Sequence, residues 1–158
     1  MMIKALKSVF YVVFAFVLTT SLALAASNTF KAKITGKEEV PAVTTAATGY
    51  AVFTLSKDGK EITYTLKVKG MEDATAAHIH AGKMGASGGV VVGLFAGPKK
   101  DGKFTGELAK GTIMDKDLVG PLAGKKLADL VTMIKDGGAY VNVHTAKNPK
   151  GEIRGQIK

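Results

Sequence analysis

Cysteine and tryptophan are both absent from the 158-residue chain. Without thiols the chain cannot form disulfides, a cysteine nucleophile or a zinc-thiolate site, so its fold must rest on packing and hydrogen bonds. Acidic residues are scarce, with 13 against 22 lysines and arginines, and histidine occurs at only three positions. The metal-binding and acid-base chemistry open to this protein is therefore confined to a few side chains.

A long charge-free segment occurs only near the N-terminus. Two lysines in the first seven residues precede an uncharged, mostly apolar stretch from residue 8 to residue 27. Ala23 and Ala25 form an A-x-A pattern, so residues 1–25 are predicted to be a signal peptide cleaved after Ala25. The alternative is an uncleaved anchor, because about 20 apolar residues can span a bilayer. The small residues and the lack of a basic flank after Ala26 favour cleavage, which would leave no stable membrane anchor.

The predicted mature chain, residues 26–158, has the length of one domain with a single core. It retains 20 basic and 13 acidic residues, which give a formal charge of +7. Its lysines are spread over predicted strands and turns, with few aromatic residues between them, so nucleic-acid binding is not expected. A solvated basic surface that attracts anionic envelope polymers is compatible with this distribution.

Alternating apolar and polar residues dominate the mature chain. Phe30, Ala32 and Ile34 alternate with Lys31 and Lys33, a spacing typical of half-buried antiparallel strands. Strands are predicted at residues 30–35, 50–55, 61–69, 75–81, 90–96, 104–108, 140–145 and 152–157. Glycine-rich turns separate these short strands, so the expected fold is all-β, an antiparallel sandwich or barrel.

One segment, residues 124–136, has a helical period instead. Leu127, Leu130, Val131 and Ile134 fall on one face of a helix, and two glycines follow it. We expect a single short amphipathic helix that packs on the sheet.

The three histidines all lie in predicted strands. His78 and His80 are two residues apart and therefore point to the same face, while His144 lies in AYVNVH with Tyr140 and Asn142 on its face. A symmetric turn at AKNPKG would place the polar residues of the two following strands opposite one another. The predicted pairs are His144 with Glu152, Asn142 with Arg154, and Tyr140 with Gln156.

Two interpretations of this polar cluster remain open. His78, His80 and His144 could bind one zinc or copper ion, with Glu152 orienting a ring from behind. Alternatively, the same side chains could form a satisfied hydrogen-bond network that has only a structural role. The second interpretation requires no cofactor.

Catalytic residues are not predicted. The adjacent Glu38 and Glu39 would point apart in an extended chain, which makes them a poor catalytic pair. The glycine-rich segment GKMGASGG leads into no helix with a phosphate-binding lysine, so it is interpreted as a connection between strands.

Several motifs resemble one known family. The segments AAHIHAG, GVVVGLFAG, YVNVHTAKNPKGEIRGQI and the upstream GKEEVPAV are similar to the CHRD domain, a module named from chordin and also found in bacterial exported proteins. The resemblance runs from about residue 30 to residue 157. It implies an extracytoplasmic, immunoglobulin-like β-sandwich without a generally established biochemical function, and its signature coincides with the polar cluster.

A more distant likeness is to copper-zinc superoxide dismutase, which also carries an H-x-H pair on a strand of a sandwich. That enzyme needs more histidines than the three of this chain, and disulfide cysteines. Superoxide dismutation is therefore not expected. The sequence favours a non-enzymatic module, exported to the periplasm or secreted, that binds an unidentified protein or envelope polymer; the alternative is a mononuclear copper or zinc protein.

Overall fold

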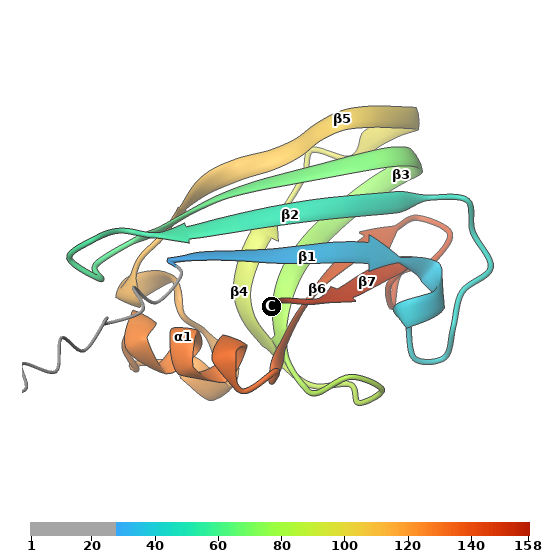
Figure 1. Ribbon diagram of the computed structural model, residues 1–158. Helices are drawn as coiled ribbons and strands as arrows, with labels where there is room; N and C mark the ends of the chain where they lie inside the picture. The colour runs from blue at the N-terminus through green and yellow to red at the C-terminus, as the bar shows by residue number, and fades with distance from the viewer. Residues whose placement is uncertain (1–27) are drawn as a thin grey trace, which may run out of the picture.

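The computed structural model describes residues 28–158 of the chain (Figure 1). The predicted signal peptide, residues 1–25, lies outside the described residues and stays a prediction. Every strand of the sheet and the whole buried core belong to the described part. A protein that begins at Ala26 therefore keeps all the contacts described below.

Residues 28–158 form an antiparallel β-sheet with one α-helix and three short 3-10 helices, so the all-β prediction is confirmed. The strands are β1 (Thr29–Thr35), β2 (Thr48–Leu55), β3 (Ile62–Ala81), β4 (Val90–Phe95), β5 (Lys100–Ile113), β6 (Ala139–Thr145) and β7 (Ile153–Gln156). The helix is α1 (Leu127–Lys135), and the 3-10 helices are η1 (Gly36–Glu38), η2 (Asp115–Asp117) and η3 (Gly120–Leu122).

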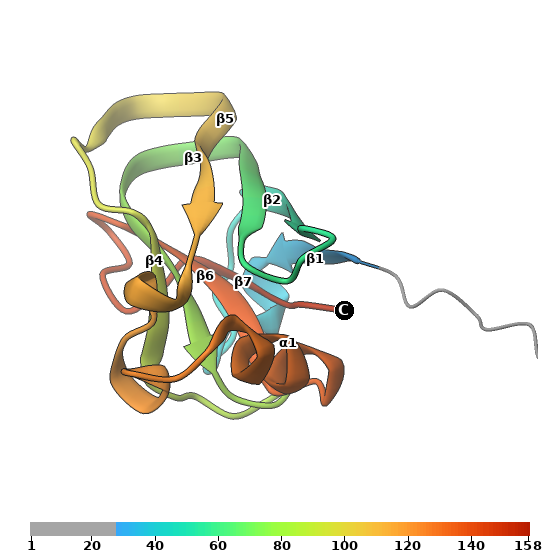
Figure 2. The same cartoon turned by 90° about the vertical axis from the view of Figure 1, so that its left-hand side faces the viewer.

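The sheet closes on itself rather than forming the two separate sheets of an immunoglobulin-like sandwich. β2 and β6 lie one after the other along one edge of β3, and β5 and β4 lie along the other edge. β2 pairs with β1, β6 pairs with β7, and Thr35 of β1 meets Arg154 of β7 to complete the ring. Figures 1 and 2 show this barrel-like curvature from two sides.

The length of β3 explains why the sheet closes. The sequence predicts two strands, 61–69 and 75–81, but the structure has one 20-residue strand across both. Gly70 and Asp73 have positive φ angles of 64° and 50°, and the pairing with β5 shifts register between Val68 and Ala74. These irregularities bend the strand without ending it, so one strand belongs to both halves of the ring.

The interior of the ring is apolar, as the period-two pattern predicts. Each strand sends alternate side chains inward, and the other side chains lie on the outside of the ring. The largest fully buried side chains are Phe53, Ile34, Ile62, Leu66, Met71, Ile79, Ile113, Leu127, Leu130, Ile134, Ile153 and Ile157.

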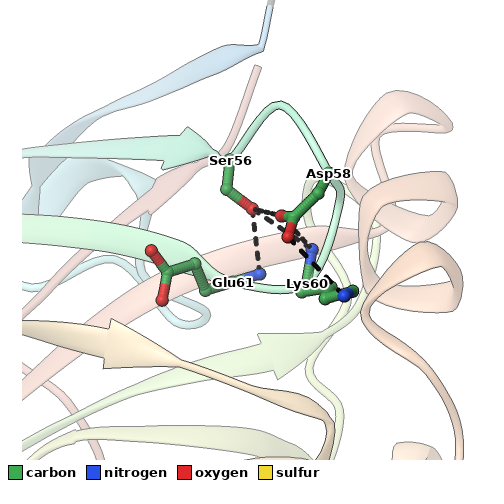
Figure 3. Close-up of polar contacts among 4 residues, drawn as sticks. All are labelled: Ser56, Asp58, Lys60 and Glu61. Carbon is green, nitrogen blue, oxygen red and sulfur yellow. Dashed lines mark hydrogen bonds and ion pairs between the residues drawn. The ribbon is translucent and has the colours of Figure 1, made fainter.

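The turn between β2 and β3 follows the prediction made from its Asp58-Gly59 pair. Gly59 has a φ of 71°, a conformation that favours glycine. Ser56 Oγ donates a 2.7 Å hydrogen bond to Asp58 and accepts hydrogen bonds from the backbone N–H groups of Lys60 and Glu61 (Figure 3). This local network fixes the hairpin register and thereby the position of the long strand β3.

The helix is three residues later at its start, and one residue shorter at its end, than the predicted 124–136 segment. Its four predicted core residues are buried, and Gly137 follows with a φ of 67°. The carboxylate of Asp129 accepts a 2.9 Å hydrogen bond from the backbone N–H of Lys126 and so caps the first turn. The helix lies outside the strands, on the lower side of the sheet in Figure 1.

Candidate functional site

The histidine strand and the C-terminal hairpin are neighbours on the outside of the ring. His78 of β3 pairs with Asn142 of β6, and His80 pairs with Tyr140. Two of the predicted hairpin pairs are confirmed, because Tyr140 faces Gln156 and Asn142 faces Arg154. The third pair is not part of the ladder, which ends at Val143 and Ile153. One continuous polar face therefore crosses β3, β6 and β7.

The three imidazole rings converge on this face. His78 and His144 have ring centroids 5.0 Å apart, and His78 and His80 have centroids 5.6 Å apart. One ring nitrogen from each histidine can be chosen so that all three lie within 4.8 Å of one another. Three nitrogen donors that converge in this way are a ligand set for zinc or copper.

Backbone carbonyls fix the protonation of two rings. Nδ1 of His144 lies 3.0 Å from the carbonyl oxygen of Pro149, and Nδ1 of His80 lies 2.9 Å from that of Gly88. A carbonyl only accepts, so both rings carry their proton on Nδ1 and have a free lone pair on Nε2. Metal-binding histidines are oriented in this way by a hydrogen bond on the nitrogen away from the ion.

The two free lone pairs differ in their partners. Nε2 of His144 lies 3.0 Å from Nδ1 of His78, which donates its proton to it. Nε2 of His80 is shielded from solvent and has no hydrogen-bond partner among the described residues. A buried polar atom without a partner is rare in folded proteins, and the centroids of the other two rings lie 5.6 and 6.1 Å from that of His80.

The environment keeps all three rings neutral. Burial, with the neighbouring His144 and His80, lowers the pKa of His78 to about 4. Burial also lowers the pKa of His80 against the opposing effect of its hydrogen bond to Gly88, and the charge of Arg154 lowers it further. Burial likewise lowers the pKa of His144. A neutral imidazole is the form that can bind a metal ion.

A stack of three side chains supports one side of the cluster. The ring of His80 lies parallel to that of Tyr140, with centroids 5.1 Å apart and 9° between the planes. The guanidinium of Arg154 lies over the ring of Tyr140, 3.4 Å from the ring centroid. The cation–π contact holds Tyr140 in place, and stacking on Tyr140 restricts the rotation of His80.

The glycine-rich connection between β3 and β4 covers this stack. One Arg154 nitrogen donates hydrogen bonds of 3.1 and 2.7 Å to the carbonyls of Lys83 and Ala86. Gln156 donates to the carbonyls of Gly82 and Gly137. The segment predicted to be a simple connection is therefore anchored to the polar face, and it supplies the carbonyl that fixes His80.

Glu152 does not orient a histidine, which corrects the role predicted for it. Its carboxylate accepts hydrogen bonds of 2.7 Å from Thr45 and Thr145 and of 3.1 Å from Asn148. Burial alone would raise the pKa of Glu152, but these hydrogen bonds outweigh it and lower the pKa. The prediction failed because the hairpin ladder ends before Glu152. Its side chain instead connects the β6–β7 turn to the loop between η1 and β2, which contains Thr45.

Comparisons with known proteins identify the family of this chain. The family model of the CHRD domain matches residues 30–157. The chain belongs to the CHRD family. Chordin of Xenopus laevis is 31% identical over 132 residues, which cover 78% of this chain and 12% of chordin. No solved structure gave a significant match.

The CHRD signature extends to residues that sequence reasoning did not connect with the cluster. Asn142 donates a hydrogen bond to the carboxylate of Glu39, and burial raises the pKa of Glu39 to about 7 against the charge of Arg154. Gly151 closes this contact, because a Cβ there would lie 2.4 Å from the Asn142 amide nitrogen and 2.6 Å from Glu39. The motif EVPA contains Glu39, and the motif around Asn148 contains Gly151. Motif membership was therefore the available signal, but no periodicity links the two segments.

Within residues 28–158, no helix has the length and apolar character needed to cross a bilayer.

Proposed function

We propose that this CHRD domain is an exported binding module and that the ligand of its polar face is a transition-metal ion, held by His78, His80 and His144. One observation carries the proposal. The three rings converge so that one nitrogen of each lies within 4.8 Å of the others, two rings give their Nδ1 proton to backbone carbonyls, and the buried Nε2 of His80 has no partner among residues 28–158.

A purely structural network does not account for this arrangement. A structural histidine gains stability when both ring nitrogens have partners, and leaving one unpaired costs on the order of 1–3 kcal/mol. His80 leaves its Nε2 unpaired although Tyr140 and Arg154 fix the ring. A bound ion would give that nitrogen a partner.

Copper(II) is the better of the two predicted ions. Imidazole suits both zinc and copper, and the general order of affinities places Cu²⁺ above Zn²⁺. The three donors come from neutral rings, so the ion would keep its double charge and have an open position for water. Zinc is expected to bind the same nitrogens more weakly.

The rings must shift slightly when the ion binds. Three ligands at about 2.1 Å from one ion lie roughly 3.5 Å apart, while Nδ1 of His78 and Nε2 of His144 are 3.0 Å apart and the three ligand atoms lie within 4.8 Å of one another. His144 also gives up the hydrogen bond from His78, because the single lone pair of its Nε2 then binds the metal. The third ligand in this proposal is Nδ1 of His78, the nitrogen beside Nε2 of His144, so binding moves the His78 proton from Nδ1 to Nε2.

The test is the melting temperature of the protein that begins at Ala26, first with a chelator and then with Cu²⁺ or Zn²⁺. Each metal should raise the melting temperature, and copper should do so at a lower concentration, because a ligand that binds only the folded state stabilises it by mass action. In a variant that combines His78→Ala, His80→Ala and His144→Ala, the metal should produce no rise.

Glu152→Gln is the matched control. This variant should melt at a lower temperature because three hydrogen bonds to the carboxylate are weakened, but its metal-induced rise should be unchanged. The proposal fails if the wild-type protein shows no rise, or if the triple-histidine variant keeps the full rise.

A further inference from the structure

A second part of the outer surface carries a group of lysines, with Glu107 of β5, which is paired with Lys110, opposite one of them. Four lysines, Lys31 and Lys33 on β1 and Lys67 and Lys69 on β3, are exposed and flank strand β2. None of them takes part in the ion pairs found among residues 28–158. We refer to these lysines, together with Tyr50 and the C-terminal Lys158, as the lysine face.

The pairing register places Tyr50 at the centre of this face. Lys33 lies opposite Tyr50 on one side, and Lys67 lies opposite it on the other side. Side chains directly opposite one another in an antiparallel sheet point to the same face, so the three form a row across β1, β2 and β3. Tyr50 is 43% exposed, more than any other aromatic ring of residues 28–158.

The neighbouring row continues the charge. Lys31 and Lys158 exchange backbone hydrogen bonds of 2.7 and 2.9 Å, so their side chains also share this outer face. Next to them, a hollow of about 570 Å³ is lined by Lys33, Lys37 and Lys158, with Glu38 as the acidic residue of its lining. Lysines therefore flank the exposed ring of Tyr50 and also line the adjoining hollow.

The spacing of the charges suits an extended anionic chain. Strands lie about 4.8 Å apart, so Lys33 and Lys67 are separated by roughly 10 Å across the sheet. Lys31 and Lys33 are separated by about 7 Å along β1. A polymer that carries one carboxylate per sugar or per disaccharide presents charges at comparable intervals.

We propose that the lysine face binds an acidic polysaccharide, with Tyr50 stacking on a sugar ring and the lysines pairing with its carboxylates. An aromatic ring offers a flat apolar surface that fits the C–H face of a pyranose, while lysines attract carboxylates at long range. A membrane surface is the weaker candidate, because membrane-binding faces insert several apolar side chains, and the exposed large ones here are Tyr50 and, in the lining of the adjoining hollow, Met84.

The test uses polygalacturonate, a linear uronic-acid polymer, and the protein that begins at Ala26. Binding is measured by titration calorimetry at low salt and at physiological salt. The variant Lys33→Gln/Lys67→Gln should lose at least about tenfold in affinity, because it removes both charges beside the ring. Tyr50→Ser should weaken binding about fivefold while the salt dependence stays the same, because stacking releases no ions.

Lys116→Gln/Lys125→Gln is the matched control, since it removes the same charge from two exposed lysines away from this face. It should bind within about twofold of the unaltered protein. The proposal is overturned if both double variants lose affinity equally, or if Tyr50→Ser has no effect. It is also overturned if phosphatidylglycerol vesicles or oligo(dT) bind as tightly as polygalacturonate and depend on the same residues.

The melting temperature of each variant in buffer shows that its fold is intact. None of the substituted side chains is buried, so these temperatures should remain close to that of the unaltered protein.

Discussion

The two halves of the outer surface have the same period-two pattern but different fates. Over β1, β2 and the first half of β3 the outward side chains are mostly lysine and threonine and lie in solvent. Over β6 and β7 the outward side chains include Asn142 and Arg154, which are only 3% and 2% exposed. Loops cover the second half and leave the first open.

This difference separates two kinds of stabilisation. On the lysine face the charges remain hydrated, so individual side chains contribute little to folding. On the polar face across β3, β6 and β7 the polar groups are shielded from water and depend on specific hydrogen-bond partners. The buried half should therefore respond strongly to substitution, and the exposed half should respond only in ligand binding.

Removal of the Arg154 guanidinium should have the largest effect. Arg154→Met strands two loop carbonyls and removes the contact with Tyr140, so it should lower the free energy of unfolding by about 3 kcal/mol. Lys67→Met, the matched change on the lysine face, should alter it by less than about 0.5 kcal/mol. Urea unfolding in the presence of chelator measures both. Equal effects would contradict the distinction between the two halves.

A methyl group at Gly151 should have the next largest effect. Gly151→Ala combines a φ of 131° with a Cβ that collides with the Asn142–Glu39 contact, so we expect a loss of about 2 kcal/mol. Gly59→Ala has a φ of 71° but open space around the new methyl, and it should cost only about 1 kcal/mol. The difference between the two variants measures the collision together with the greater backbone strain at a φ of 131°. A cost at Gly59 equal to that at Gly151 would show that the covered site is not tightly closed.

The pH dependence of stability should be the smallest effect. The lowered histidine pKa values mean that the unfolded chain binds more protons below pH 6.5, so the histidines make stability rise as pH increases from about 4 toward 6.5. Glu39 acts in the opposite direction. Its folded pKa of about 7 lies above the ordinary 4.5, so its contribution is present at low pH and is lost as pH rises through 7.

Glu39→Gln isolates that opposing contribution. The variant should gain about 1 kcal/mol relative to the unaltered protein between pH 5 and pH 7, measured by urea unfolding with chelator present. A pH profile parallel to that of the unaltered protein would show that Glu39 does not hold its proton in the folded state.

Local sequence patterns predicted much of this structure. The β alternation, the Asp58-Gly59 turn, the helix face and the pairing of Asn142 with Arg154 depend on neighbouring residues or on one hairpin, and all are present. The convergence of the histidines also followed from the alternation, once the H-x-H strand was placed beside the hairpin.

The features that were missed depend on distant segments. Closure of the sheet requires β3 to continue through Gly70 and Asp73, and irregularities of this kind are hard to distinguish from a loop in sequence. Glu39 reaches Asn142 across 103 positions of the chain, and Thr45 reaches Glu152 across 107. No periodicity connects residues so far apart, so the partners of the buried polar face could not be assigned.

The most direct test of the metal site is a ¹⁵N NMR titration of the histidines with Zn²⁺. This experiment reports which nitrogen of each ring carries the proton before and after the metal is added. Without metal, all three rings should carry the proton on Nδ1. Zinc should then perturb Nε2 of His80 and His144 but Nδ1 of His78, with the His78 proton moving to Nε2. Unchanged nitrogen shifts at saturating zinc, or metal on a different set of nitrogens, would contradict the account.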